Sequence, residues 1–105
     1  MKKVLPYHFS KINFVFTGYG KDCRNFDIIA DGRLIGHAHQ GCTWRWPMNQ
    51  IMVECFNAFD RAALQAFTLW GSPSPEEEYA VYPRAEDETF FSLNYSWFKE
   101  NILAP

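Results

Sequence analysis

Asp31 and Gly32 stand between two segments in which apolar and polar residues alternate. An Asp-Gly pair in this setting is the strongest short-range hairpin signal, because both central residues of the tight turn need a positive φ angle. We therefore expect a strand over residues 25–31 to fold back antiparallel onto a strand over residues 33–40. The alternation over residues 10–19 predicts a further strand before them. The first 40 residues thus predict a three-stranded meander.

Residues 47–60 carry apolar side chains at every third or fourth position, which predicts an amphipathic helix. Pro47 suits the first turn of such a helix, because the N–H that proline lacks would be unpaired there anyway. The apolar positions are Met48, Ile51, Met52, Cys55, Phe56 and Phe59. We expect this face to pack on the sheet, with Cys55 serving as a small core residue.

The remainder of the chain predicts short elements. Residues 64–70 run into a turn and predict a buried strand, although the alanines around them also favour a helix. Ser74 and Glu77 have the capping-box spacing, which predicts a short helical turn. Residues 89–95 alternate again and predict a strand, and residues 96–103 predict a terminal helical turn.

These elements predict an α+β fold, with an antiparallel sheet of about five to six short strands and one main helix packed on a face. Because helices do not alternate with the strands, a nucleotide-binding fold built from parallel βαβ units is excluded. The 105 residues have the length of one domain, 1–105. A hydrophobic share of 48% lets this domain bury a core and excludes a disordered tail.

Several features favour a cytoplasmic protein. The apolar runs are only a few residues long, against the roughly 18–20 residues that a membrane helix needs. Lys2 and Lys3 are not followed by the apolar stretch of a signal peptide. The three cysteines leave one unpaired in any disulfide scheme, which favours free thiols in a reducing compartment.

No catalytic or cofactor motif such as Gly-x-Ser-x-Gly or a Walker loop occurs, so we expect neither an enzyme nor a bound cofactor. His37 and His39 are two residues apart on a predicted strand and therefore share a face. They leave two alternatives open. With Cys42 they would supply three zinc ligands, or they would serve as the general acid and base of a small metal-free ribonuclease. Histidines on the exposed side of a strand are the simpler interpretation.

The loop before the predicted helix contains the sequence Trp44, Arg45, Trp46. Tryptophan and arginine are the side chains that dominate binding hot spots, so this loop predicts a contact with a partner. Packing of the loop over the start of the helix is the alternative.

Acidic residues are concentrated in the last third of the chain. The net charge is −2, but residues 74–105 hold seven acidic and two basic side chains. Such a segment repels nucleic-acid phosphates and attracts a basic protein, although charge runs are also typical of solvated turns. The predicted partner-binding residues are Trp44, Trp46, Glu76, Glu77, Glu78, Tyr79, Tyr82, Glu86, Asp87 and Glu88.

In its size, its α+β class and its acidic, aromatic surface, the whole chain resembles the small immunity proteins of bacterial polymorphic-toxin systems, including contact-dependent growth inhibition. The resemblance implies a monomer that binds a cognate toxin domain one to one and blocks its active site. The toxin would be a basic nuclease, such as a ribonuclease, whose phosphate-binding cleft the carboxylates would occupy. Two alternatives stay open. One is a phage-encoded inhibitor of a host nuclease complex, and the other is a small hydrolase that uses His37 and His39.

Overall fold

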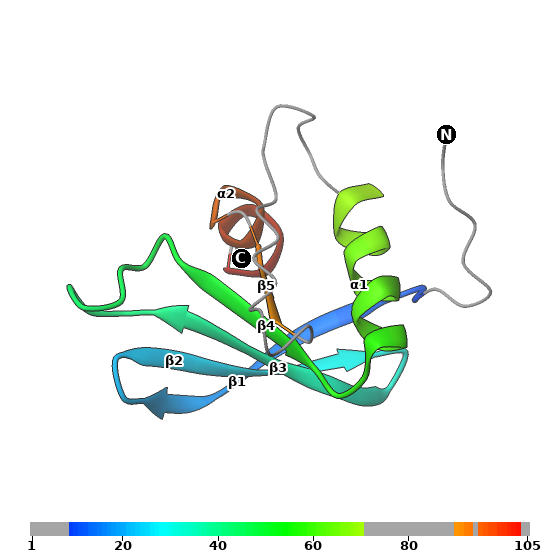
Figure 1. Cartoon of the computed structure of the whole chain (residues 1–105), viewed down its shortest axis with the longest axis horizontal. Helices are drawn as coiled ribbons and strands as arrows, with labels where there is room; N and C mark the ends of the chain where they lie inside the picture. Colours follow the sequence, from blue (N-terminus) through cyan, green and yellow to red (C-terminus); the bar gives the residue numbers. More distant parts are fainter. Residues whose placement is uncertain (1–8, 71–89, 94, 104–105) are drawn as a thin grey trace.

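One antiparallel sheet, with helices on one of its faces, makes up the part of the chain that the computed structural model describes, namely residues 9–70, 90–93 and 95–103 (Figure 1). The strands follow each other in chain order: β1 (Ile12–Gly20), β2 (Cys23–Ala30), β3 (Arg33–Gly41), β4 (Ile51–Cys55) and β5 (Phe90–Ser92). The helices are α1 (Ala58–Trp70), α2 (Tyr95–Phe98) and the π-helical segment η1 (Lys99–Leu103). The α+β class and the helix-covered antiparallel sheet are confirmed. Against the five to six strands expected, four described strands have at least five residues, and β5 has only three.

The hairpin at Asp31 and Gly32 forms as predicted. The two residues have φ angles of 51° and 81°, and Ala30 pairs with Arg33 across the turn. The Asp31 carboxylate also accepts the backbone N–H of Lys11 at 2.8 Å. The turn residue therefore anchors the start of β1 as well as reversing the chain.

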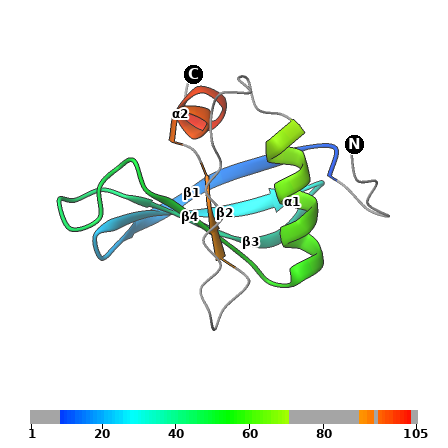
Figure 2. The same cartoon turned by 45° about the horizontal axis from the view of Figure 1, so that its top comes forward.

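The two faces of the sheet differ in burial. Figures 1 and 2 place α1 and α2 on the same face, which we call the covered face, and we call the opposite one the open face. Along β2, Phe26, Ile28 and Ala30 are buried on the covered face, while Asp27 and Ile29 are only partly buried on the open face. The core consists of Phe9, Phe26, Ile28, Ala30, Ile35, Ala38, Ile51, Val53, Cys55, Ala63, Leu64, Leu93 and Phe98.

A bulge at Ile35 interrupts the regular alternation of faces along β3. Ile28 pairs with Gly36 and Ile29 with Leu34, so Ile35 has no partner of its own on β2. Ile35 is consequently buried, although strict alternation places it on the face of His37. A regular period of two cannot reveal a bulge, because the extra residue shows only in the pairing of two strands.

The segment predicted as a helix over residues 47–60 is instead a loop, strand β4 and the start of α1. Ile51, Val53 and Cys55 are buried, and β4 pairs antiparallel with β3. The helical spacing was misleading because Ile51 and Cys55 fit a period of four and a period of two equally well. The strand is favoured because its pairing with β3 satisfies backbone N–H and C=O groups that the edge of β3 would otherwise leave without partners. Cys55 is a core residue as predicted, but it comes from a strand.

Helix α1 begins after Asn57, which caps it. The Asn57 Oδ1 atom accepts the Asp60 backbone N–H at 2.8 Å, and Asn57 Nδ2 donates to Asp60 Oδ2 at 2.8 Å. The buried Asp60 carboxylate also accepts a 2.9 Å hydrogen bond from Arg33 Nη2 on β3. These contacts give the first turn of α1 a fixed position beside the sheet.

Residues 64–70, predicted as a strand, form the second half of α1. The strand prediction is therefore wrong. The leucines of the segment and the alanines in and before it explain why, because both residue types have high helix propensity. Leu64 of α1 is also part of the hydrophobic core, so packing against the sheet further stabilises the helical conformation.

The bounds of the C-terminal elements differ from those predicted. Of the strand expected over residues 89–95, only Phe90–Ser92 is in β5. The terminal helical segment begins at Tyr95, one residue before the predicted Ser96, and continues through η1. The helical turn predicted over residues 74–77 lies outside the described residues.

Candidate functional site

The connection between β3 and β4, which we call the tryptophan loop (residues 42–50), projects with the β1–β2 turn from the end of the sheet away from α1 (Figure 1). At the base of the loop, the Gly41 N–H donates to the Gln50 carbonyl at 2.9 Å, and the Gln50 N–H donates to the Pro47 carbonyl at 2.9 Å. Only glycine fits at position 41, because a Cβ atom there would collide with the Pro47 and Trp46 carbonyl oxygens. The loop therefore folds tightly over the end of β3.

Asp22, in the neighbouring β1–β2 turn, accepts two hydrogen bonds from the tryptophan loop. Its backbone carbonyl accepts the Cys42 N–H at 3.1 Å, and its carboxylate accepts the Thr43 hydroxyl at 3.3 Å. The Thr43 hydroxyl oxygen in turn accepts the Trp46 N–H at 3.3 Å. Asp22 has a φ angle of 64°, a left-handed conformation that aspartate tolerates better than most residues. These bonds hold the loop backbone in one arrangement.

The two tryptophans of the loop have different surroundings. Trp44 is 85% exposed, and the guanidinium of Arg45 lies 5.4 Å from the centroid of its ring, within the range of a cation–π interaction. Trp46 is half-buried, and its N–H and carbonyl both bond to Thr43 within the loop. Both were predicted to contact a partner. The structure leaves the Trp44 indole open to solvent and uses Trp46 to hold the loop together.

An exposed aromatic pair on β1, which the sequence analysis did not single out, lies at the same end of the sheet. Phe16 and Tyr19 are 49% and 74% exposed, and their ring centroids are 5.4 Å apart. They share a face because the strand register shifts between Phe16 and Gly18, so that Thr17 forms a bulge. The Phe16 ring also meets the buried Phe26 ring at 5.6 Å, which connects this pair to the core.

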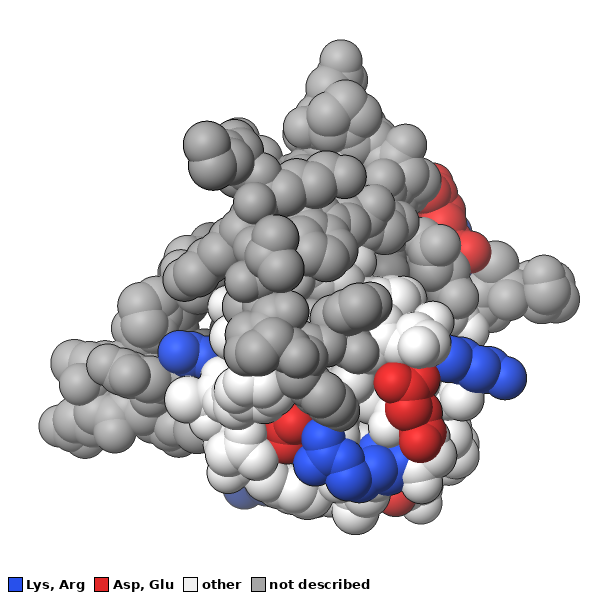
Figure 3. Space-filling view, turned by 90° about the vertical axis from the view of Figure 1, so that its right-hand side faces the viewer, with Lys and Arg blue, Asp and Glu red and all other residues white. Residues whose placement is uncertain are grey.

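The acidic and tyrosine residues that were predicted to bind a partner lie outside the described residues. They are Glu76, Glu77, Glu78, Tyr79, Tyr82, Glu86, Asp87 and Glu88. Among the described residues, basic and acidic side chains are mixed, and the side view of Figure 3 shows them next to one another. One such pair is Arg33 and Asp60, at 2.9 Å.

His37 and His39 share the open face of the sheet, as their spacing predicted, and each has a polar partner on β2. His37 Nδ1 lies 3.1 Å from Asp27 Oδ1, and His39 Nδ1 lies 3.0 Å from Asn25 Oδ1. These contacts follow from the register, since Asp27 pairs with His37 and Asn25 pairs with His39. An amide oxygen accepts only, so Nδ1 of His39 carries the proton and its Nε2 is left as an acceptor.

Burial lowers the pKa of His39 from 6.5. The nearby Glu54 carboxylate opposes this effect, and the His37 imidazole adds to it. His39 is therefore a neutral base at neutral pH, and it lies beside the His37 imidazole on the same face of β3. Two neighbouring imidazoles are side chains of the type that general acid–base catalysis uses most often.

The cysteines are free thiols, and none joins the histidines in a metal site. Within the described ranges, no group of three or more His, Cys, Asp or Glu side chains is placed to hold a metal ion, so the combination of His37, His39 and Cys42 is not assembled. Burial raises the pKa of the Cys23 thiol and raises that of Cys55 to about 12. These two thiols are therefore protonated and unreactive at neutral pH.

Comparisons of the chain with known protein families, with curated proteins and with solved structures give no match. Of the helices in the described part of the chain, none combines the length and hydropathy that a bilayer crossing demands.

Proposed function

We propose that the chain is a protein-binding module and, more specifically, a cytoplasmic immunity protein that binds and neutralises a bacterial toxin domain. The observation that supports binding is the exposed Trp44 indole on a hydrogen-bonded loop. Tryptophan is among the side chains most enriched in binding hot spots. A loop whose backbone is already fixed loses little conformational freedom when it binds.

A partner that covered Trp44 would bury a large apolar surface, whereas the exposed side chain contributes little to the stability of the fold. At 85% exposure its indole is almost wholly in water in the free chain. Aromatic side chains bury about 150–250 Å² in an interface, which at about 25 cal/mol per Å² is roughly 4–6 kcal/mol before the costs of association. A net contribution of about 2 kcal/mol is the level that defines a hot spot.

The partner in this proposal is a basic nuclease domain. Six of the twelve acidic residues of the chain fall within residues 76–88. Carboxylates in that segment compete with nucleic-acid phosphates for the cationic groups of a nuclease. Long-range attraction would speed association, and a buried contact at Trp44 would slow dissociation. One chain would block the active site of one toxin domain, with no catalysis or cofactor of its own.

The test is co-expression with the products of the reading frames next to the gene. The proposal expects one product to stop growth when expressed alone, and expects this chain to restore growth and to co-purify with it in equal amounts. The Trp44→Ala variant should lose both effects, whereas Leu34→Ala, an exposed apolar residue near the opposite end of the sheet, should keep them. A complex with a host nuclease assembly instead would favour the phage-inhibitor alternative. If no product is toxic and none binds, the immunity proposal is wrong.

A second candidate function, a small hydrolase, is favoured by the polar partners of the histidines on the open face. The His37 contact with Asp27 and the His39 contact with Asn25 hold two imidazoles side by side on β3. In this alternative, a variant with both His37→Ala and His39→Ala loses hydrolysis of an RNA substrate and keeps any protein partner. The immunity proposal expects no RNA hydrolysis by the wild-type chain.

A further inference from the structure

Strand β1 leaves its outer edge without a partner among the described strands, because it is the first strand of the sheet and pairs with β2 alone. The Asp31 N–H donates to the Lys11 carbonyl at 2.9 Å, so Lys11 belongs to a hydrogen-bonded pair with β2. Alternate residues of an antiparallel strand bond to opposite sides. Ile12, Phe14 and Phe16 therefore direct their backbone N–H and C=O groups away from β2, toward the edge that no described strand pairs with.

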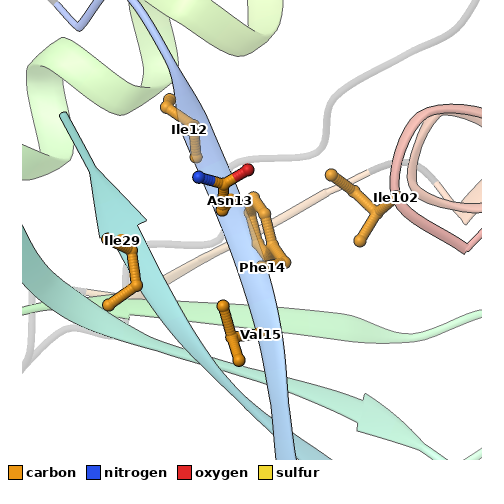
Figure 4. A pocket seen from close by; sticks show the side chains of 6 residues that line it. All are labelled: Ile12, Asn13, Phe14, Val15, Ile29 and Ile102. Carbon is orange, nitrogen blue, oxygen red and sulfur yellow. The ribbon is translucent and has the colours of Figure 1, made fainter. Parts of the chain in front are cut away.

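This edge lacks the features that usually prevent one strand from pairing with another. Natural edge strands are guarded by charged side chains, proline or β-bulges. Residues 12–16 contain none of these, and the bulge at Thr17 lies just beyond them. A groove of about 470 Å³ also runs beside β1, lined by Ile12, Asn13, Phe14, Val15, Ile29 and Ile102. Figure 4 shows Ile102 of η1 facing Phe14 across this groove, so there is room beside the strand for added side chains.

We propose that two copies of this chain pair antiparallel through their β1 edges, with the two-fold axis at Phe14. In this register Phe14 lies opposite Phe14 of the second copy, and Ile12 lies opposite Phe16 of the second copy. The two-fold axis also places Phe16 opposite Ile12 of the second copy. Each of the three pairs exchanges two backbone hydrogen bonds, about six in all. The bulge at Thr17 ends the regular part of the strand and therefore limits the pairing to residues 12–16.

The side chains of β1 fit a copy of the same strand. The strand is uncharged, so it favours an uncharged partner, and its own sequence meets that requirement. Centring the pair on Phe14 places Lys11 opposite Thr17 of the second copy, so like charges do not meet. On the covered face the apolar side chains of Ile12, Phe14 and Phe16 would meet their counterparts beside the groove.

The dimer is compatible with the proposed function but does not depend on it. The tryptophan loop connects β3 and β4 at the end of the sheet, whereas the proposed contact runs along the β1 edge (Figure 1). A dimer would leave both copies of Trp44 open to solvent, so each copy could still hold one partner. The contact covers only five residues of each strand and the adjoining groove, so we expect a dissociation constant in the micromolar range.

Sedimentation equilibrium of the purified full-length chain tests this proposal, at concentrations from about 10 to about 500 µM. The wild type should approach twice the 12.3 kDa mass of one chain as the concentration rises. Two double variants test the register. Asn13→Lys with Val15→Lys places lysines directly opposite each other in the dimer, because residue 13 faces residue 15 of the second copy. Asn13→Glu with Val15→Lys places opposite charges there instead.

Both variants should fold, because Asn13 and Val15 are exposed on the open face and a lysine at position 15 lies next to Asp27. Circular dichroism checks this. The double-lysine variant should be monomeric throughout, and the Glu/Lys variant should dimerise at least as well as the wild type. A wild type that stays at 12.3 kDa, or two variants with the same dissociation constant, would overturn the proposal. No binding partner is needed, so these results are separate from the test of the immunity function.

Discussion

Replacing Asn57 with alanine tests the position at which helix α1 begins. Asn57 makes two hydrogen bonds of 2.8 Å with Asp60, one to its backbone N–H and one to its carboxylate. Losing an N-cap side chain costs about 1 kcal/mol. The Asp60 side chain is only 3% exposed, so the loss of a donor to its Oδ2 atom adds about 1 kcal/mol more. We expect the free energy of unfolding to fall by about 2 kcal/mol in total.

Urea denaturation followed by circular dichroism measures this change, and thermal denaturation should show a decrease in Tm of about 10 °C. Asn49→Ala is the matched control, because Asn49 is exposed in the tryptophan loop and makes no side-chain hydrogen bond within the described part of the chain. Its effect should stay within about 0.5 kcal/mol. If residues 47–60 were one helix, Asn57 would lie on its wet face and alanine would be neutral or slightly stabilising. Equal stabilities of the two variants would therefore refute the helix start described above.

Three further predictions concern titration and packing. Burial raises the pKa of the Cys55 thiol to about 12, so above its ordinary value of 9.0 the unfolded chain loses a proton that the folded chain keeps. The free energy of unfolding should therefore fall as the pH rises above about 9 and continue to fall toward about 12, and urea titrations of Cys55→Ala should lack this part of the decline. Burial lowers the pKa of His39, so below 6.5 the unfolded chain binds a proton more readily. Stability should then fall as the pH decreases, less so in His39→Gln, and an NMR titration should place the His39 midpoint below that of an unfolded control. Finally, Gly36→Ala should lower the free energy of unfolding by about 3 kcal/mol or more, because its Cβ atom would collide with the Glu54 carbonyl oxygen. Normal stability of this variant would contradict the observed pairing of β3 with β4.

Local signals predicted the first half of the fold well. The Asp-Gly turn and the alternating residues beside it depend on backbone conformation and a period of two, and both can be seen in neighbouring residues. The second half depended on contacts between distant residues. Ile51 and Cys55 are compatible with a helix or a strand, and the choice is made by β3, which has an edge for β4 to pair with.

In the candidate site, too, local spacing could be predicted from the sequence and contacts between distant residues could not. The spacing of His37 and His39 was sufficient to place them on one face. Their partners Asp27 and Asn25 were not identified, because those contacts depend on the register of β2 against β3. Likewise, the residue types of the tryptophan loop predicted a contact surface. They could not show that hydrogen bonds to Asp22 fix the loop or that Trp44 is the tryptophan left exposed.

The affinity of the Trp44→Ala variant for the co-purified partner is the most direct test of the proposed binding function. Isothermal titration calorimetry should compare it with the wild type and with Leu34→Ala. A loss of about 2 kcal/mol corresponds to a dissociation constant raised about 30-fold, and we expect at least that change for Trp44→Ala with an unchanged melting temperature. Leu34→Ala should bind as the wild type does. Wild-type affinity of the Trp44→Ala variant would contradict the assignment of the tryptophan loop as the contact surface.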